Sequence, residues 1–541
     1  MIDIRKATVM GSLLLFGAAG CADLVVTNQN DADADRALAT AGDVESLISP
    51  AYFTWWYGGT STDGPAMFLS VQSYQHSAYP ANFAMNHYSR LPREAIANNP
   101  ADGDYNYVFY TWYENYAALA GIADGLTSIA EEEGIAETLG PDRVLRATAF
   151  AKFMQGLSHG SIALLYDQGY VIDENVQRFD EAGVAIPLET VPYNEMMAAA
   201  IGYLDEAIAL SEGADFVIPA SWMTVEVPAD ELVRRANSWK ARFLANVART
   251  PEERAAVDWD AVLVAVDNGI TADREIEAVD RIFWDAIQYM VYQSWSQVSY
   301  QILGMADQSG KYQAWINTEP SDRHPEQTLG GNFLIVTPDT RFAQGTTLDE
   351  QTANPGTLYE IPPFSPSDGW NRPDRGTYRW SWYWHKAYHN YYYLYGEDTS
   401  LKFMLMDEMN MLAAEAHYRN GNLGAAADLI NLTRTAAGLN ATDAAGTNTS
   451  CVPKLPSGEC GDLWEMLKWE KRIETQFAGP MGMGWYLDGR GWGELLAGTQ
   501  LHFPMPAQEL VLFGLPVYTF GGDSPTGTST GSIYEWPYEN N

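Results

Sequence analysis

Hydrophobic residues recur at helical spacing through most of the first half of the chain. In the segment 141–166, apolar side chains at 144, 147, 150, 151, 154 and 157 fall on one face of a helix. The segment 193–212 repeats this pattern at 197, 200, 201, 204, 207 and 208. Pro141 suits a first helical turn, where the N–H that it lacks would be unpaired. We therefore predict helices over the segments 43–57, 105–131, 141–166, 193–212 and 231–250.

A further helical pair is predicted downstream, over residues 403–439. The sequence FMLMDEMNMLAAEAHYRNGNLGAAADLINLTRTAAGL indicates a helix, an Asn-Gly turn and a second helix, with small alanines that allow close packing. Helical pairs that recur loosely are typical of tetratricopeptide arrays. The predicted fold class is mostly α: a superhelix of tetratricopeptide-like repeats with a large, irregular, loop-rich insertion that carries short strands.

The insertion is predicted over residues 271–399, where the helical pattern stops. Loops rich in Pro, Gly and Asp, such as YEIPPFSPSDGWNRPDRG, alternate there with short strand-like runs such as NFLIVT. Long loops in a compact chain are usually functional or disordered, and the many Trp and Tyr residues argue against disorder. We therefore predict that this irregular region binds the ligand.

The stretch TYRWSWYWHKAYHNYYYLYG, at 377–396, is the most aromatic part of the insertion. Tyr378, Trp380, Trp382 and Trp384 alternate with other residues, which predicts a half-buried strand with these rings on one side. Two interpretations stay open at this point. The rings pack on the helical array, or they contact a ligand.

The N-terminus has the features of an export signal. Arg5 and Lys6 precede an apolar run that is too short to span a bilayer. The small residues before Cys21 resemble a bacterial lipobox, in which the chain is cut before the cysteine and the thiol is lipidated. The alternative is an ordinary secretory signal with an incidental cysteine. We predict a lipid anchor on Cys21.

The other two cysteines, Cys451 and Cys460, flank a short loop that contains Pro and Gly. This spacing predicts a local disulfide in an oxidising compartment. The loop offers too few soft ligands for zinc.

The net charge of the chain disfavours some classes of binding partner. The chain has 541 residues with 70 acidic and 32 basic side chains, a formal charge of −38 that disfavours nucleic acid and anionic lipid headgroups. The sequence contains no HExxH, GxSxG or phosphate-binding glycine loop, and we expect no cofactor. A glycosidase with two catalytic carboxylates stays open, because paired carboxylates cannot be singled out among so many acids.

Several long stretches share a family pattern. They are CADLVVTNQNDADADRAL, RVLRATAFAKFMQGLSHG, VPYNEMMAAAIGYLDEAIAL and the late helical pair, with Glu408, Glu415, Asn431 and Arg434. The segment WEKRIETQFAGPMGMGWYLDGRGWGELLAGTQLHFPMPAQEL adds Glu470, Arg472, Glu474, Trp485, Tyr486, Asp488, Arg490, Pro504, Pro506 and Glu509. Together they resemble the SusD/RagB family of outer-membrane nutrient-binding lipoproteins, although Leu487 and Gly489 interrupt the family's usual aromatic-Asp-Arg run.

The resemblance implies a right-handed superhelix of tetratricopeptide-like pairs that supports an irregular ligand-binding region. It implies a lipid-anchored protein on the extracellular side of the outer membrane. It also implies a SusC-like TonB-dependent transporter as partner and an oligosaccharide, or in some members a peptide, as ligand. It implies no catalysis. The expected divisions are a signal peptide at 1–20, a tether at 21–40, helical repeats at 41–270, the insertion at 271–399, the last helical hairpin at 400–440 and a C-terminal segment at 441–541.

Candidate ligand-binding residues follow from the chemistry of sugars. A Trp or Tyr ring can cover the C–H face of a sugar while its own polar edge stays hydrogen-bonded. Such rings lose little side-chain entropy on binding. We expect two or three rings of a set in loops or at helix ends to line the site, with an amide and a guanidinium that bind hydroxyls: Trp56, Tyr79, Tyr312, Trp315, Trp370, Asn371, Arg372 and Trp380. A scaffold that binds only protein is the remaining alternative.

Overall fold

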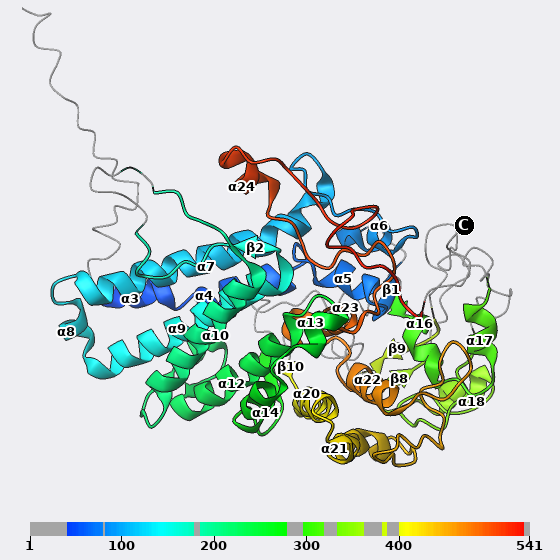
Figure 1. Cartoon of the computed structure of the whole chain (residues 1–541). Coiled ribbons are helices and arrows are strands. Elements are labelled where there is room, and N and C mark those ends of the chain that lie inside the picture. The colour runs from blue at the N-terminus through cyan, green and yellow to red at the C-terminus, as the bar shows by residue number, and fades with distance from the viewer. Residues whose placement is uncertain are drawn as a thin grey trace, which may run out of the picture.

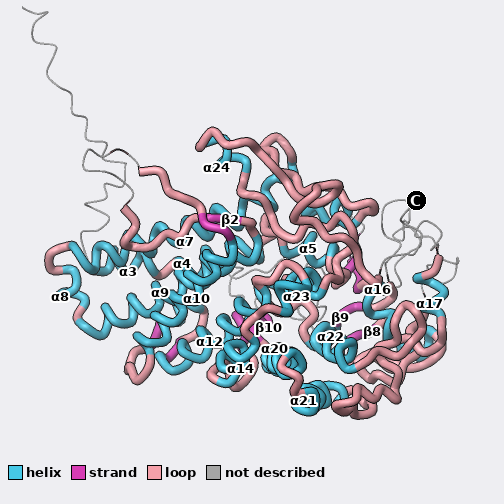
Figure 2. The backbone as a smooth tube through the Cα atoms, in the orientation of Figure 1, coloured by secondary structure: helices cyan, strands magenta, loops and turns pink. Residues whose placement is uncertain are grey.

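A computed structural model describes residues 41–78, 82–177, 184, 186–277, 296–318, 333–361, 381–386 and 400–534. It has two parts, which Figure 1 shows side by side: an array of long helices and a loop-rich region around α17, α18, β8 and β9. In Figure 2 the loop-rich region contains mostly irregular backbone with short helices and strands.

The array is a series of helices in which each packs on the next. α4 packs on α7, α7 on α9, α9 on α10, α10 on α12, α12 on α14, α14 on α20, α20 on α21, and α21 on α22. The bounds are α3 (Ala41–Ile48), α4 (Ala51–Thr60), α7 (Asn106–Glu131), α9 (Pro141–Leu165), α10 (Tyr193–Ser211), α12 (Ala229–Asn246), α14 (Trp259–Asp267), α20 (Met406–Arg419), α21 (Leu423–Ala436) and α22 (Leu463–Glu474).

Shorter helices connect and cover the array or lie in the loop-rich region. They are α5 (Ala66–Gln72), α6 (Met85–Ser89), α8 (Ile135–Leu139), α11 (Ala220–Met223), α13 (Pro251–Ala255), α16 (Tyr300–Leu303), α17 (Lys311–Ile316), α18 (Leu348–Ala353), α23 (Gly484–Trp492) and α24 (Ala507–Leu512). No helix among the described residues combines the length and the apolar character that crossing a bilayer requires.

The predicted helices agree with the observed ones except for the segment 43–57. There α3 ends at Ile48 and α4 begins at Ala51. The break falls at Pro50, because a proline is tolerated at a helix start but not in its interior. The predicted single helix is therefore two.

Close packing of the array depends on small residues in α9. A Cβ atom at Gly160 would lie 2.2 Å from Cε2 of Phe243 on α12. One at Gly156 would lie 2.6 Å from Cγ of Leu204 on α10. α9 therefore sits closely between α10 and α12.

Within the described ranges, five antiparallel pairs of short strands complete the fold. They are β1 (His76–Ala78) with β7 (Ser296–Val298), β2 (Gln168–Gly169) with β3 (Val191–Pro192), β4 (Val217–Ile218) with β5 (Val227–Pro228), β6 (Arg274–Glu277) with β10 (Ser400–Met404), and β8 (Tyr359–Glu360) with β9 (Trp384–His385). In β6–β10, Ile276 lies opposite Leu401. The chain therefore leaves the helical array at β6 and returns to it at β10, and these two strands lie side by side.

The predicted strand NFLIVT is not a strand, since residues 333–337 have irregular backbone. Phe333, Leu334 and Ile335 are all buried, so the alternation of a half-buried strand is missing. The N–H of Ile335 donates to the hydroxyl of Tyr383 instead of to a neighbouring strand.

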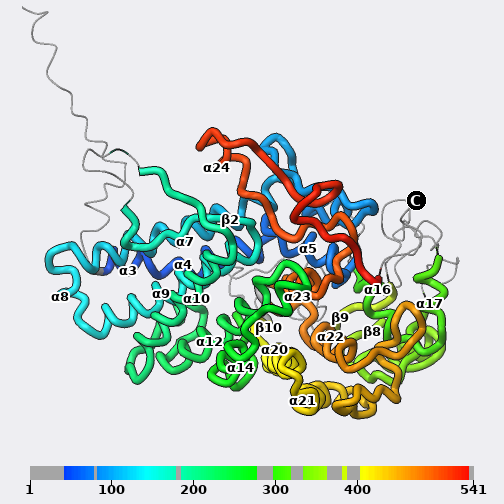
Figure 3. Tube along the Cα trace, viewed as in Figure 1, coloured from blue at the N-terminus to red at the C-terminus, as the bar shows by residue number. Residues whose placement is uncertain are grey.

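The C-terminal segment runs back along the N-terminal part of the chain. Figure 3 shows its red trace beside the blue segments around α5 and α6. The N–H of Ile96 donates to the carbonyl of Phe520 at 2.9 Å, and the Asn98 amide donates to the carbonyl of Met505 at 3.0 Å. Cys451 and Cys460 are joined by a disulfide, the pairing that the sequence predicts.

Candidate ligand-binding region

The two sequence-predicted rings of α17 are buried. Tyr312 has no exposed surface and Trp315 has 6%. The Tyr312 hydroxyl donates to the carbonyl of Gln301 at 2.7 Å. The Trp315 ring centroid lies 5.6 Å from that of Tyr300 and 6.2 Å from that of Phe333. Both rings are packing residues, and the expectation that they face a ligand is corrected.

Trp56 is also a packing residue. It lies on α4 and is 2% exposed. Its ring centroid is 5.5 Å from that of Phe403 on β10 and 6.0 Å from that of Trp55. The ring fills the space between α4 and β10, so the expectation that it contacts a ligand is corrected as well.

The other predicted ligand-binding residues, and the predicted lipidation site, lie outside the described residues, so their roles stay predictions: Tyr79, Trp370, Asn371, Arg372, Trp380 and Cys21. The aromatic stretch 377–396 is described only at 381–386. There Trp382, Tyr383 and Trp384 are all buried, so the predicted alternation is wrong for these residues and packing is the interpretation that holds.

Buried side chains fix the backbone of the loop-rich region. The Asp307 carboxylate accepts hydrogen bonds from the N–H of Val336 at 3.0 Å and of Tyr312 at 3.2 Å. The Tyr383 hydroxyl donates to Gln351 at 2.6 Å. These bonds tie segments that are distant in sequence, and the two bonds to Asp307 satisfy main-chain groups that strand pairing leaves without partners.

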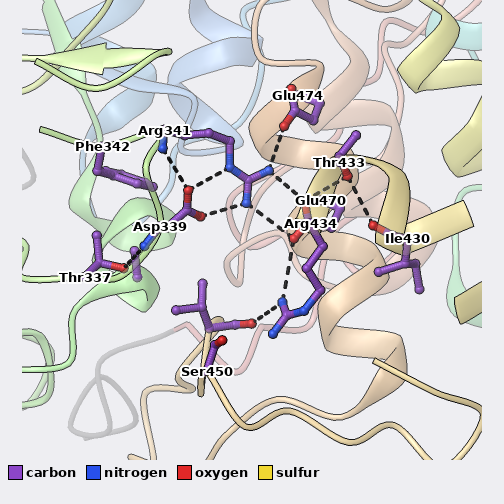
Figure 4. A network of polar contacts seen from close by, with 12 residues as sticks. Thr337, Asp339, Arg341, Phe342, Ile430, Thr433, Arg434, Ser450, Glu470 and Glu474 are labelled. Atoms are coloured by element: carbon purple, nitrogen blue, oxygen red, sulfur yellow. Dashed lines mark hydrogen bonds and ion pairs between the residues drawn. The ribbon is translucent and has the colours of Figure 1, made fainter. Parts of the chain in front are cut away.

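A buried arginine joins this region to α22. Figure 4 shows Arg341 surrounded by the carboxylates of Asp339, Glu470 and Glu474. The guanidinium donates to Asp339 at 2.7 and 2.9 Å, to Glu470 at 2.6 Å and to Glu474 at 2.7 Å. On the far side of Glu470, the Thr433 hydroxyl of α21 donates to the same carboxylate at 2.9 Å. One ion cluster therefore fixes the loop-rich region to the end of the helical array.

Arg341 keeps its charge in this cluster. Burial by itself lowers the pKa of its guanidinium, but the charges of Asp339 and Glu470 outweigh burial and raise that pKa well above its usual value. A permanently charged arginine is what allows these acids to stay inside the protein.

A second ion cluster joins the array to the C-terminal segment. The fully buried Arg254 of α13 donates to Glu415 of α20 at 2.9 and 2.6 Å and to Asp488 of α23 at 3.1 Å. Asp488 also accepts from Lys471 of α22 at 2.8 Å. Glu415 and Asp488 belong to the family pattern in the sequence, and their contacts show that they stabilise the fold.

We expect Glu415 to make stability depend on pH in the acid range. Burial raises the pKa of Glu415, but the charge of Arg254 and its hydrogen bonds outweigh burial and lower that pKa from its ordinary value of 4.5 to about 2. Because this pKa is lowered, the ionised Glu415 carboxylate contributes its full stabilisation of the fold above pH 4.5. That contribution is lost as the pH falls toward 2. The difference corresponds to about 3 kcal/mol. Urea unfolding should therefore show that Glu415→Gln has a much lower free energy of unfolding than the unchanged protein at pH 7. This difference should shrink as the pH falls.

The matched control is Asp230→Asn. Asp230 forms an exposed ion pair with Arg234, so solvent screens it and its pH curve should follow that of the unchanged protein. If the free energy of unfolding of Glu415→Gln stayed below that of the unchanged protein by the same amount from pH 7 to pH 3, the stabilising role of the ionised Glu415 carboxylate would be contradicted.

An open pocket of about 630 Å³ lies between α7, α24 and the residues Tyr170, Ile172 and Leu188. Its lining is mostly aromatic and includes the side chains of Phe109, Trp112, Tyr113, Tyr116, Tyr170, Gln508, Glu509 and Phe513. The sequence analysis missed this pocket. The available signal was the spacing of Phe109, Tyr113 and Tyr116, which places three rings along one face of α7. No group of three or more His, Cys, Asp or Glu side chains in the described part of the chain is placed to hold a metal ion.

Comparison with solved structures finds similar folds. A SusD homolog from Bacteroides thetaiotaomicron has a TM-score of 0.54 at 12% identity, covering 89% of this chain and 97% of its own. A SusD homolog from Parabacteroides distasonis has a TM-score of 0.51 at 12% identity, with coverages of 82% and 84%. A SusD superfamily protein from Bacteroides vulgatus has a TM-score of 0.50 at 13% identity, with coverages of 85% and 89%. No protein-family model and no curated protein sequence matches the chain. The likeness in structure confirms the predicted fold class.

Proposed function

Because the chain has the fold of SusD superfamily proteins, we propose that it is a nutrient-binding protein of the cell surface. It captures an oligosaccharide and delivers it to a SusC-like TonB-dependent transporter of the outer membrane. A lipid on Cys21 holds it to that membrane, facing outward. It binds its ligand without catalysis.

The observation that carries this proposal is the position of the β8–β9 pair. Tyr359 lies opposite His385, and Glu360 lies opposite Trp384. The chain between these strands, residues 361–383, carries Trp370, Asn371, Arg372 and Trp380. Its two ends are therefore held together on the part of the molecule that the Arg341 cluster fixes. A segment that starts and ends on a fixed base can present ligand-binding residues at a low entropic cost.

The chemistry of this segment suits a sugar. The Trp370 ring can cover the C–H face of a sugar, and Asn371 and Arg372 can bind its hydroxyls. A neutral ligand is also compatible with a charge of −38.

A peptide is the second candidate ligand. The same charge would attract a basic peptide, and the fold places no restriction on the ligand. Glycosidase chemistry has less support, because the buried carboxylates of Glu408 and Glu415 are each paired with an arginine. A carboxylate in that state is a poor general acid.

We expect Trp370→Ala to weaken oligosaccharide binding by about 2 kcal/mol, which is roughly 30-fold, because it removes the ring that stacks on the sugar. Isothermal titration with an oligosaccharide selected on a glycan array measures this. The matched control is Tyr113→Ala, which removes an exposed ring on α7 and should leave oligosaccharide binding unchanged. Equal oligosaccharide affinities of Trp370→Ala and the unchanged protein would refute the role of Trp370. Binding heat with peptides but not with oligosaccharides would favour a peptide as the ligand.

A further inference from the structure

The pocket between α7 and α24 presents several aromatic rings to solvent. Tyr113 is 54% exposed and Phe513 is 44% exposed. The ring centroids of Phe109 and Tyr113 lie 5.7 Å apart, and those of Tyr170 and Phe513 lie 6.1 Å apart. The electron-rich faces of such rings attract cations as well as apolar groups.

One acidic side chain lies among these rings. Glu509 is half-buried on α24, and none of the described residues donates a hydrogen bond to its carboxylate or forms an ion pair with it. The lining of the pocket, as far as the structure describes it, contains no Lys, Arg or His. Burial alone raises the pKa of Glu509. After burial, the charge of Glu509 is also a cause of the raised pKa of the Tyr170 hydroxyl, so this charge acts inside the pocket.

From these observations we propose that the pocket is a second binding site, which accepts the side chain of a lysine in a peptide. The four methylene groups of lysine contact the aromatic rings, and its ammonium group pairs with Glu509. An unpaired carboxylate beside aromatic faces lacks a cation, and the ligand supplies it.

The hydrogen bonding of Tyr116 in the pocket disfavours an amino sugar relative to lysine. An amino sugar also carries an ammonium group, but its hydroxyls need partners. The Tyr116 hydroxyl is already occupied, since it donates to the carbonyl of Tyr170 at 3.1 Å and accepts from the N–H of Tyr170 at 2.6 Å. Buried hydroxyls without partners would weaken binding, whereas the apolar stem of lysine needs none.

The surroundings of the pocket favour a peptide over a free amine. Large apolar side chains next to Phe513 are exposed, and they offer a surface to the residues on either side of the lysine: Val511, Leu512, Leu515 and Val517. The charge of −38 draws basic peptides toward the molecule. In Figure 1, α24 lies far from α17 and α18, so this site is separate from the loop-rich region and does not rest on the proposed function.

The test is titration of the purified protein with two blocked tripeptides, Ala-Lys-Ala and Ala-norleucine-Ala. Norleucine keeps the apolar stem and lacks the ammonium group. The lysine peptide should bind at least about tenfold more tightly. Glu509→Gln should abolish this preference, and Tyr113→Ala should weaken both peptides. Each change leaves the buried core intact, because one is nearly isosteric and the other removes an exposed ring.

Three results would overturn the inference. They are equal affinity for the two tripeptides, an unchanged preference in Glu509→Gln, and tighter binding of glucosamine than of the lysine peptide. Trp370→Ala serves as the control and should bind the lysine tripeptide as the unchanged protein does. A failure of the proposed oligosaccharide function would therefore leave this test unaffected.

Discussion

Replacing Arg341 with methionine is expected to lower the free energy of unfolding by about 3–5 kcal/mol. Methionine has a similar length but no charge, so Asp339 would stay buried without a cation, and Glu470 would keep only Arg434, at 3.7 Å. Both side chains have no exposed surface, so solvent cannot substitute for the guanidinium. Urea unfolding at pH 7 measures the loss. The loss should shrink at pH 5, because burial already raises the pKa of Glu470 and its protonation relieves part of the penalty.

Arg143→Met is the matched control. Arg143 forms an ion pair with Glu45 at 2.6 Å but is 42% exposed, so the same substitution there should cost less than about 1 kcal/mol. Similar losses for the two variants would show that the Arg341 cluster does not fix the loop-rich region as inferred.

The second large effect is expected from Trp239→Ala, at about 3–5 kcal/mol. Trp239 is 1% exposed on α12. Its ring centroid lies 5.4 Å from that of Trp55 on α4 and 6.0 Å from that of Phe403 on β10, and the Arg242 guanidinium lies 4.7 Å above it. The substitution leaves a cavity where three elements meet. Thermal and urea unfolding both measure the loss.

Tyr113→Ala is the control for this substitution. It removes an aromatic ring that is 54% exposed, so unfolding should change by less than about 0.5 kcal/mol. A small loss for Trp239→Ala would contradict a rigid helical array. A large loss for Tyr113→Ala would mean that this ring packs rather than lining an open pocket.

Helices were predictable here because their signal is local. The apolar face of α9 is set by residues three and four apart, and Pro141 marks its start within the same segment. The break between α3 and α4 was also visible as Pro50. Helical periodicity alone could not place it, because residues on both sides fit one amphipathic pattern.

The loop-rich region was predictable in extent but not in structure. Its backbone is held by partners that no local pattern reveals: Glu470 lies 129 positions from Arg341 in the sequence. Asp307 and Tyr383 bond to main-chain groups of the run NFLIVT, which has strand composition but no strand partner. The composition of this run predicts a strand, but hydrogen bonds to residues distant in sequence hold it in an irregular conformation.

The candidate site shows the same limit for aromatic residues. Tyr312 and Tyr113 both lie on helices in aromatic-rich sequence, yet one is fully buried and the other is more than half exposed. Exposure depends on which distant element covers each ring. The pocket also needs Glu509 beside α7, and these parts are almost 400 positions apart in the sequence.

The central claim is that a rigid frame of stacked helices displays a segment that captures a nutrient and leaves it unaltered. The most direct measurement is equilibrium binding of the purified protein to a soluble oligosaccharide pool, followed by mass analysis of the retained and the free sugars. We predict saturable retention of a subset of oligosaccharides, recovered at their original masses. Absence of retention, or recovery of shortened chains, would contradict the claim.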